Sequence, residues 1–261
     1  MKVGFIQFNP HFGEKEENVE RALSFIKRTD AGLLVLPELF NSGYLFTSKE
    51  EAKTAAETVP EGFTTRRLIQ IAAKQDMFIV AGLAEVSDGA VYNSAVLVGP
   101  DGHIGTYRKA HLFKDEPKWF AKGNTPFQVY EIGPARIGMM ICFDWIFPEV
   151  ARTLALKGAD ILCHPSNLML PYCQKAMVTR CLENRIFAIT CNRIGCEDRG
   201  GERLEFTGLS EIVDPTGNVL SLAGHDEEKA HVVEIDPLEA RRKQVGVNRI
   251  FEERRTDLYE L

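Results

Sequence analysis

The stretch RIGMMICFDWIFPE, residues 136–149, decides the fold that this sequence predicts. An apolar run leads straight into Cys142, and a Phe-Pro-Glu triplet that can open a helix follows soon after. An α/β sheet presents its chemistry at the carboxyl end of a buried strand, just before the next helix. A cysteine near a helix N-terminus gains thiolate character from the helix dipole. Cys142 is therefore a candidate nucleophile; the plainer alternative is a buried small hydrophobe, which is what most free cysteines are.

Two further polar side chains lie where apolar segments end. Glu38 ends LLVLPE (33–38), and Lys109 lies in GTYRKAHLF (105–113). A partly buried carboxylate has a raised pKa and can act as a general base, and an ammonium can donate to a developing oxyanion. The backbone N–H of Phe143, next after the candidate nucleophile, is a natural second donor. A nucleophile, a carboxylate and an ammonium together favour covalent catalysis over a binding surface.

Each of these polar residues also has a plainer interpretation. The candidate carboxylate could be a solvated turn residue, and most lysines lie on the surface. Glu116, in FKDEPKWF (113–120), is either a solvated loop acid or a side chain that orients Lys109 or positions a water. Cys163 and His164 are another candidate reactive pair, but they end a different predicted strand from the candidate nucleophile and are interpreted as core residues.

Strand-like and helix-like segments alternate along the chain, and each half contains a hairpin with a Pro/Gly turn. The expected helices span 14–28, 61–75, 147–157 and 173–185. The expected strands span 3–8, 32–36, 77–85, 91–98, 103–108, 127–132, 136–142, 160–164, 187–193, 208–213, 218–223 and 230–235. This pattern predicts an α/β fold of quasi-duplicated halves, with two sheets packed face to face and helices outside. No Ser/Gly-rich linker separates the halves, so residues 1–261 are expected to form one domain.

Composition limits the class of protein. Hydrophobic residues make up 44% of the 261 residues, which is enough for a sizeable core and too many for a disordered chain. The formal net charge is −6 and the lysines and arginines form no single basic block, which disfavours nucleic acid as a partner. The N-terminus lacks a signal-peptide pattern, and no apolar run approaches the ~20 residues of a membrane span. A cytoplasmic protein with no membrane partner is therefore expected.

The six cysteines all lie in the second half of the chain. They form no CxxC pair, and no histidine pair has metal-ligand spacing. Because the chain is not a small secreted domain, free thiols are expected rather than disulfides, and no metal site is expected.

Three motifs occur in order along the chain, namely LPELFNSGY (36–44), YRKAHLF (107–113) and ICFDWIFPE (141–149). With them the chain resembles the nitrilase superfamily of carbon–nitrogen hydrolases over nearly its whole length. The resemblance implies an αββα four-layer sandwich that needs no metal or organic cofactor. It also implies a homodimer of αββααββα architecture, or a higher homo-oligomer, in which the charged tail from about residue 237 reaches the partner subunit.

The resemblance further implies a Glu-Lys-Cys triad, here Glu38, Lys109 and Cys142, with Glu116 as a fourth catalytic member. Glu38 then takes the thiol proton, and the thiolate attacks the substrate carbon. Lys109 and the Phe143 N–H stabilise the oxyanion. Ammonia leaves, and a water activated by Glu38 releases the acid from the thioester.

The residues after the cysteine bear on the substrate. Phe143-Asp144 stands where nitrile-specialised relatives carry Trp-Glu, and the sequence is similar there to amidases, carbamoyl-amide hydrolases and the archaeal-type small nitrilases that share CFDW. The leading hypothesis is hydrolysis of a small amide or carbamoyl amine. The alternatives are a nitrilase for small aliphatic nitriles and an idle scaffold, and the intact triad argues against the scaffold. The aromatic residues that either line the pocket or belong to the core are Tyr44, Phe46, Trp119, Trp145 and Tyr172.

Overall fold

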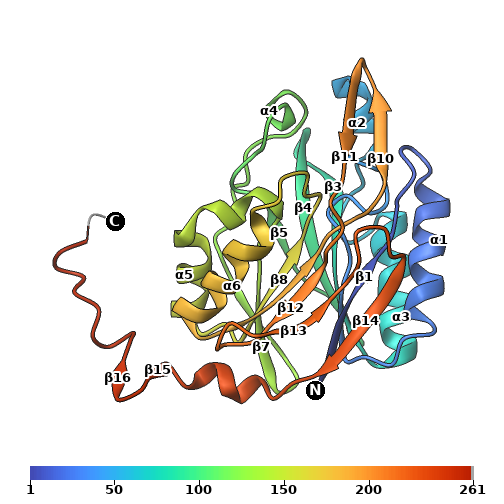
Figure 1. Cartoon of the computed structure of the whole chain (residues 1–261). Helices are drawn as coiled ribbons and strands as arrows, with labels where there is room; N and C mark the ends of the chain where they lie inside the picture. Colours follow the sequence, from blue (N-terminus) through green and yellow to red (C-terminus); the bar gives the residue numbers. More distant parts are fainter. Residues whose placement is uncertain (260–261) are drawn as a thin grey trace.

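The computed structural model describes residues 1–259, which fold into two six-stranded sheets packed between pairs of helices (Figure 1). The first sheet has the order β14-β1-β2-β3-β4-β5, and the second has the order β13-β12-β9-β8-β7-β6. The strands of the first sheet are β1 (Lys2–Gln7), β2 (Leu33–Val35), β3 (Phe78–Ser87), β4 (Ala90–Gly99), β5 (Gly102–Arg108) and β14 (Lys229–Glu234). Those of the second are β6 (Val129–Ile132), β7 (Ala135–Met139), β8 (Ile161–Pro165), β9 (Phe187–Cys191), β12 (Glu211–Val213) and β13 (Val219–Leu222).

Four helices form the outer layers. Helices α1 (Lys15–Ile26) and α3 (Phe63–Gln75) cover the first sheet, and α5 (Pro148–Leu156) and α6 (Cys173–Asn184) cover the second (Figure 1). Each sheet contains three neighbouring parallel strands, β1-β2-β3 in one and β7-β8-β9 in the other. The predicted αββα sandwich with quasi-duplicated halves is therefore confirmed.

Strand β2 shows why the sequence folds into these layers. Leu33 and Val35 pack in the cluster that joins the two sheets, whereas Leu34 and Leu36 pack in the cluster beneath α1 and α3. Successive side chains of a strand point to opposite faces, so a strand covered on both faces reads as a continuous apolar run. The helices bury one stripe each, as Val19, Ala22, Leu23 and Ile26 do on α1.

Several short elements were not predicted. They are the helices α2 (Lys49–Ala55) and α4 (Glu116–Trp119), the 3₁₀ helices η1 (Cys142–Ile146) and η2 (Pro237–Arg241), and the strand pairs β10 (Cys196–Arg199) with β11 (Glu202–Glu205) and β15 (Gln244–Val245) with β16 (Asn248–Arg249). Elements this short carry too few residues for a periodic hydrophobic pattern. A local signal did exist at α2, because the Ser48 hydroxyl accepts the Glu51 N–H at 3.2 Å and caps the helix.

Some expected strands end differently. The strand expected at 136–142 stops at Met139, and the one expected at 208–213 begins only at Glu211. The sheets face each other through β1–β3 and β8–β9, so the carboxyl ends of parallel strands from both sheets meet at one end of the sandwich. Within residues 1–259, no helix combines the length and the hydrophobicity needed to cross a bilayer.

Candidate active site

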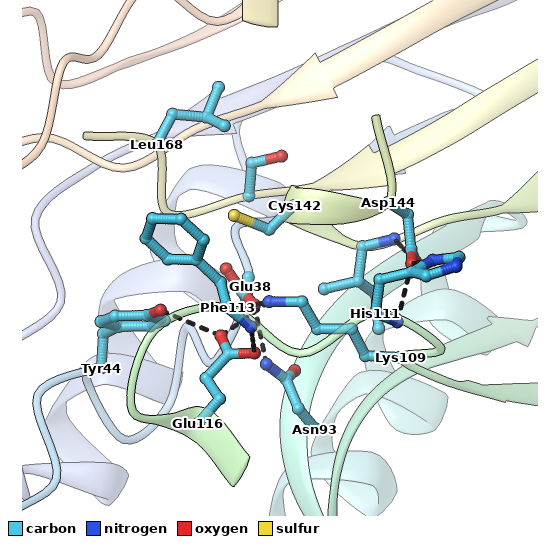
Figure 2. Close-up of polar contacts among 12 residues, drawn as sticks. Glu38, Tyr44, Asn93, Lys109, His111, Phe113, Glu116, Cys142, Asp144 and Leu168 are labelled. Atoms are coloured by element: carbon cyan, nitrogen blue, oxygen red, sulfur yellow. Dashed lines mark hydrogen bonds and ion pairs between the residues drawn. The ribbon is translucent and has the colours of Figure 1, made fainter. Parts of the chain in front are cut away.

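Cys142 is the first residue of the short helix η1, at a sharp turn after β7. Its backbone has φ 40°, in the left-handed region that residues other than glycine seldom adopt. One contact from outside the turn and one within it hold this conformation. His164 Nε2 donates to the Cys142 carbonyl at 2.9 Å, and the Ile141 N–H donates to Asp144 Oδ2 at 2.9 Å. The thiol is buried and directed toward the polar cluster beneath it (Figure 2).

Asp144 ties this turn to the segment that carries the lysine. It is fully buried and accepts hydrogen bonds from the Tyr107 hydroxyl at 2.8 Å and from His111 Nδ1 at 2.7 Å. The His111 ring stacks on Phe147 with 3.7 Å between centroids. The chain after β5 and the chain after β7 therefore hold each other in place.

Lys109 is the centre of the cluster. Its Nζ donates to Glu38 Oε1 at 2.7 Å and to Glu116 Oε1 at 2.6 Å (Figure 2), and the side chain is inaccessible to solvent. Its backbone N–H donates to the Asn93 carbonyl at 2.8 Å, which fixes the end of β5 against β4. The structure thus brings the sequence-predicted residues together beside the cysteine.

Glu38 is held from two sides. Asn93 Nδ2 donates to Glu38 Oε1 at 2.7 Å, and the β3 backbone packs so closely that a Cβ on Gly82 would lie 2.5 Å from the Glu38 Cα. The other carboxylate oxygen, Oε2, is buried and has no hydrogen-bond partner among the described residues. Asn93 was missed by sequence reasoning, although it stands as a polar residue within the apolar run of 91–98.

Glu116 is buried at the first turn of α4, so its interpretation as a solvated loop acid is wrong. Its Oε1 also accepts the Tyr44 hydroxyl at 3.0 Å, and its Oε2 accepts the Phe113 N–H at 2.9 Å. Because every oxygen has a fixed donor, Glu116 holds the lysine in one position.

Burial and the charges of neighbouring groups determine which of these residues carries a proton. Burial alone would lower the pKa of the Lys109 ammonium, but the charges of Glu116 and Glu38 outweigh it and raise that pKa. Burial raises the pKa of Glu116. Burial, followed by the Glu38 charge, raises the pKa of the Cys142 thiol well above its usual range, and a backbone hydrogen bond from Asn167 works in the opposite direction. Lys109 is therefore charged, and Cys142 rests as a thiol.

This result corrects the expected thiolate character of Cys142. The helix that begins at Cys142 is a 3₁₀ helix of five residues, whose dipole is small, and burial and nearby carboxylates outweigh it. Ionisation of the thiol needs a base within the site.

A pocket of about 170 Å³ opens on Cys142 and has a mostly apolar lining. Of the five aromatic residues proposed for it, only Trp145 and Tyr172 line this pocket. Tyr44, Phe46 and Trp119 instead line a smaller hollow on the far side of Glu116. Tyr44 and Phe46 belong to the loop after Glu38, and Trp119 belongs to α4.

The alternative reactive pair belongs to the core, as expected. Cys163 is fully buried in β8, and burial raises the pKa of its thiol. Burial also lowers the pKa of His164 to about 4, so this ring is neutral and supports the Cys142 carbonyl. All six cysteines are free thiols. Residues 1–259 contain no cluster of three or more side chains that could hold a metal ion.

Comparison with known proteins identifies the class. The carbon–nitrogen hydrolase family matches residues 2–243. A nitrilase from Pyrococcus abyssi is 46% identical over 263 residues, covering 99% of each chain. An (R)-stereoselective amidase from a Pseudomonas species is 39% identical over 241 residues, covering 90% of this chain and 85% of that protein. The solved structure of a carbon–nitrogen hydrolase from Helicobacter pylori superposes with a TM-score of 0.88 at 26% identity, covering 99% of this chain and 97% of that one.

The chain belongs to the carbon–nitrogen hydrolase family and is an enzyme of that class. The resemblance to the nitrilase superfamily that three motifs predicted is confirmed.

Proposed function

We propose that this enzyme hydrolyses a small amide or carbamoyl amine through a thioester on Cys142 and releases ammonia. The observation that supports it most is the buried Lys109 held between Glu38 and Glu116, with Glu38 Oε2 left unpaired. A pocket of about 170 Å³ is below the about 300–1,000 Å³ of typical ligand pockets, which favours a small substrate.

Activation of the nucleophile follows from the charges. Glu38 Oε2 accepts the proton of the Cys142 thiol, which becomes a thiolate. The transfer moves one proton between two buried groups and leaves the net charge of the cluster unchanged. It therefore avoids the large penalty of introducing a new charge into a buried site.

Acylation and deacylation then use the same groups. The thiolate adds to the carbonyl carbon, and the oxyanion accepts hydrogen bonds from Lys109 and the Phe143 N–H. Glu38 returns its proton to the substrate nitrogen, so that ammonia leaves and a thioester remains. Glu38 next takes a proton from water, hydroxide adds to the thioester, and the thiol leaves with that proton as the acid is released. Glu116 keeps Lys109 charged and oriented throughout.

An amide suits these donors better than a nitrile does. An amide carbonyl already carries the oxygen that Lys109 and the Phe143 N–H hold. A nitrile first forms a thioimidate, and a water must add before an oxygen is present. The second candidate is a nitrilase for small aliphatic nitriles, which the 46% identity to a nitrilase favours.

Ammonia release from matched pairs tests the choice between them. We expect kcat/KM for a small aliphatic amide or carbamoyl amine to exceed that for the matching nitrile by at least about tenfold, or roughly 1.4 kcal/mol. Equal or better turnover of the nitriles across the panel would establish the second candidate instead.

We also propose that residues 1–261, whose last two lie outside the described residues, act as one domain that pairs with a second copy through α5 and α6. Leu156 on α5 and Leu182 on α6 are 44% and 45% exposed, and Val247 in the tail is 93% exposed. Apolar side chains on adjacent outer helices and in a tail without its own core fit a partner subunit. The resulting dimer has αββααββα architecture.

The six cysteines are free thiols, which fits a protein that works in the reducing cytoplasm. We propose that it works there without a metal or organic cofactor.

A further inference from the structure

Asn167 is buried without using its side chain. It follows the end of β8, is 1% exposed, and neither Oδ1 nor Nδ2 has a hydrogen-bond partner among the described residues. Within residues 1–259 it is the one side chain with two such buried, unpaired polar atoms. Buried polar groups are nearly always paired, so this exception calls for a partner that comes from outside the chain.

The position of Asn167 indicates what that partner is. Asn167 lines the same pocket as Cys142. The backbone on either side is fixed, because the Ser166 N–H donates to the Cys191 carbonyl at 2.8 Å and the Leu168 N–H donates to Asn192 Oδ1 at 2.7 Å. Asn167 is therefore held in place in the lining of the pocket that contains the reacting atom.

We infer that Asn167 is the specificity-determining residue that recognises the amide group of the substrate. This inference rests on the proposed function and names the group by which the site selects an amide. Oδ1 accepts a substrate N–H, and Nδ2 donates to a substrate oxygen. An amide or carbamoyl group offers both partners, whereas an aliphatic nitrile offers only an acceptor.

The surroundings strengthen the effect of this single side chain. The neighbouring lining residues Phe113, Phe143, Leu168 and Met169 are apolar. They accommodate a hydrocarbon chain but cannot tell an amide from a nitrile. In such a site, a substrate that leaves a buried polar group unpaired is rejected by about tenfold to a hundredfold.

The test compares Asn167→Leu with wild type on butyramide and butyronitrile. Leucine has the same branched shape and no polar atoms. We expect kcat/KM for butyramide to fall at least tenfold, chiefly through KM, while that for butyronitrile changes less than threefold. If nitrile turnover is below detection, the Ki of butyronitrile as a competitive inhibitor takes its place, and it is expected to stay within threefold.

Met169→Leu is the matched control, because it changes an apolar residue of the same pocket and should leave the amide-to-nitrile ratio unchanged. Asn167→Ala provides a second variant that cannot overpack the pocket, and the same fall in the ratio is expected. Thermal unfolding and labelling of Cys142 by iodoacetamide check that each variant keeps its fold.

The outcomes separate the inference from the proposed function. If wild type turns over butyramide and the Asn167 variants lose both substrates equally, or lose neither, the inference is overturned and the proposed function stands. If wild type releases ammonia from no amide, carbamoyl amine or nitrile, the proposed function itself fails.

Discussion

Cys142 depends on Glu38 more than an exposed cysteine would depend on a base. Burial raises the pKa of its thiol, so almost none of it is ionised at neutral pH without proton transfer inside the site. Lys109 stays charged because two carboxylates hold it, and it cannot serve as the base itself. The roles of the three residues therefore follow from burial and the neighbouring charges, which together decide which group carries a proton.

The first prediction concerns the base and the oxyanion donor. Glu38→Gln keeps the shape but removes the base, so both acylation and deacylation should fail. Lys109→Ala should lose at least about 10²–10³ in kcat, the usual effect of losing one oxyanion donor. Glu116→Ala should also be impaired, because Lys109 then loses one of its two anchors. Steady-state ammonia release measures all three, and near-normal kcat in Glu38→Gln would end the triad proposal.

The second prediction concerns pH and His164. Its pKa is about 4 in the folded protein against about 6.5 when unfolded, because burial disfavours the charged ring. Between these values the unfolded chain binds more protons, so the free energy of unfolding falls as pH falls. The loss by pH 4 amounts to roughly 3 kcal/mol, and the stability is regained above pH 6.5.

Urea unfolding at pH 7 and pH 4 measures this effect in wild type and in His164→Gln. Glutamine does not titrate and can still donate to the Cys142 carbonyl, so the variant should lose distinctly less stability between the two pH values. Equal losses in the two proteins would show that His164 is not a buried neutral ring.

At the scale of the element, strand β3 fixes the position of the base. A Cβ on Gly82 would lie 2.5 Å from the Glu38 Cα and 2.9 Å from the Leu39 nitrogen, which are backbone atoms that cannot rotate away. Gly82→Ala should therefore displace Glu38 and reduce kcat at least tenfold, because misplacement of a reacting group by about 1 Å is enough for a large loss.

Gly32→Ala is the matched control for that substitution. A Cβ on Gly32 would meet its nearest neighbour, the Lys2 carbonyl oxygen, at 3.5 Å, which is ordinary contact. Its kcat should stay within about twofold of wild type. Equal activity in the two alanine variants would show that the closeness of β3 to Glu38 does not matter.

The sequence could predict elements that bury a face, and it could not predict the contacts between them. Continuous apolar runs such as 33–36 identified central strands, and the polar residues at strand ends identified the cluster around Lys109. Asn93 and Asn167 were missed because their roles depend on contacts made in the folded chain. Asn93 bonds Glu38, which is 55 residues away in the sequence, and Asn167 lines the pocket that contains Cys142. The protonation of Cys142 was mispredicted because burial, which dominates it, is not visible in one local stretch.

At the scale of the whole molecule, the two sheets and the proposed dimer explain different features. The pocket beside Cys142 is formed by residues of one chain, whereas α5, α6 and the tail leave apolar side chains exposed. Light scattering at dilute concentration should give twice the chain mass or a higher multiple. Leu182→Glu on α6 should shift this toward the monomer, because an unpaired charge in an interface is unfavourable.

Ile104→Glu on β5 is the control, since Ile104 is similarly exposed, at 38%, but belongs to the first sheet, whereas α5 and α6 cover the second. It should leave the mass unchanged. A wild-type protein that is a clean monomer would contradict the dimer and the role of the tail together.

The most direct test of the central claim is to trap the thioester. Wild type is quenched in acid during turnover of butyramide, and its peptides are mapped by mass spectrometry while ammonia release is followed in parallel. The account predicts a butyryl group on the peptide that carries Cys142, the same adduct in Cys163→Ala, and neither adduct nor ammonia in a folded Cys142→Ala. A butyryl group on Cys163, or ammonia release from Cys142→Ala, would contradict it.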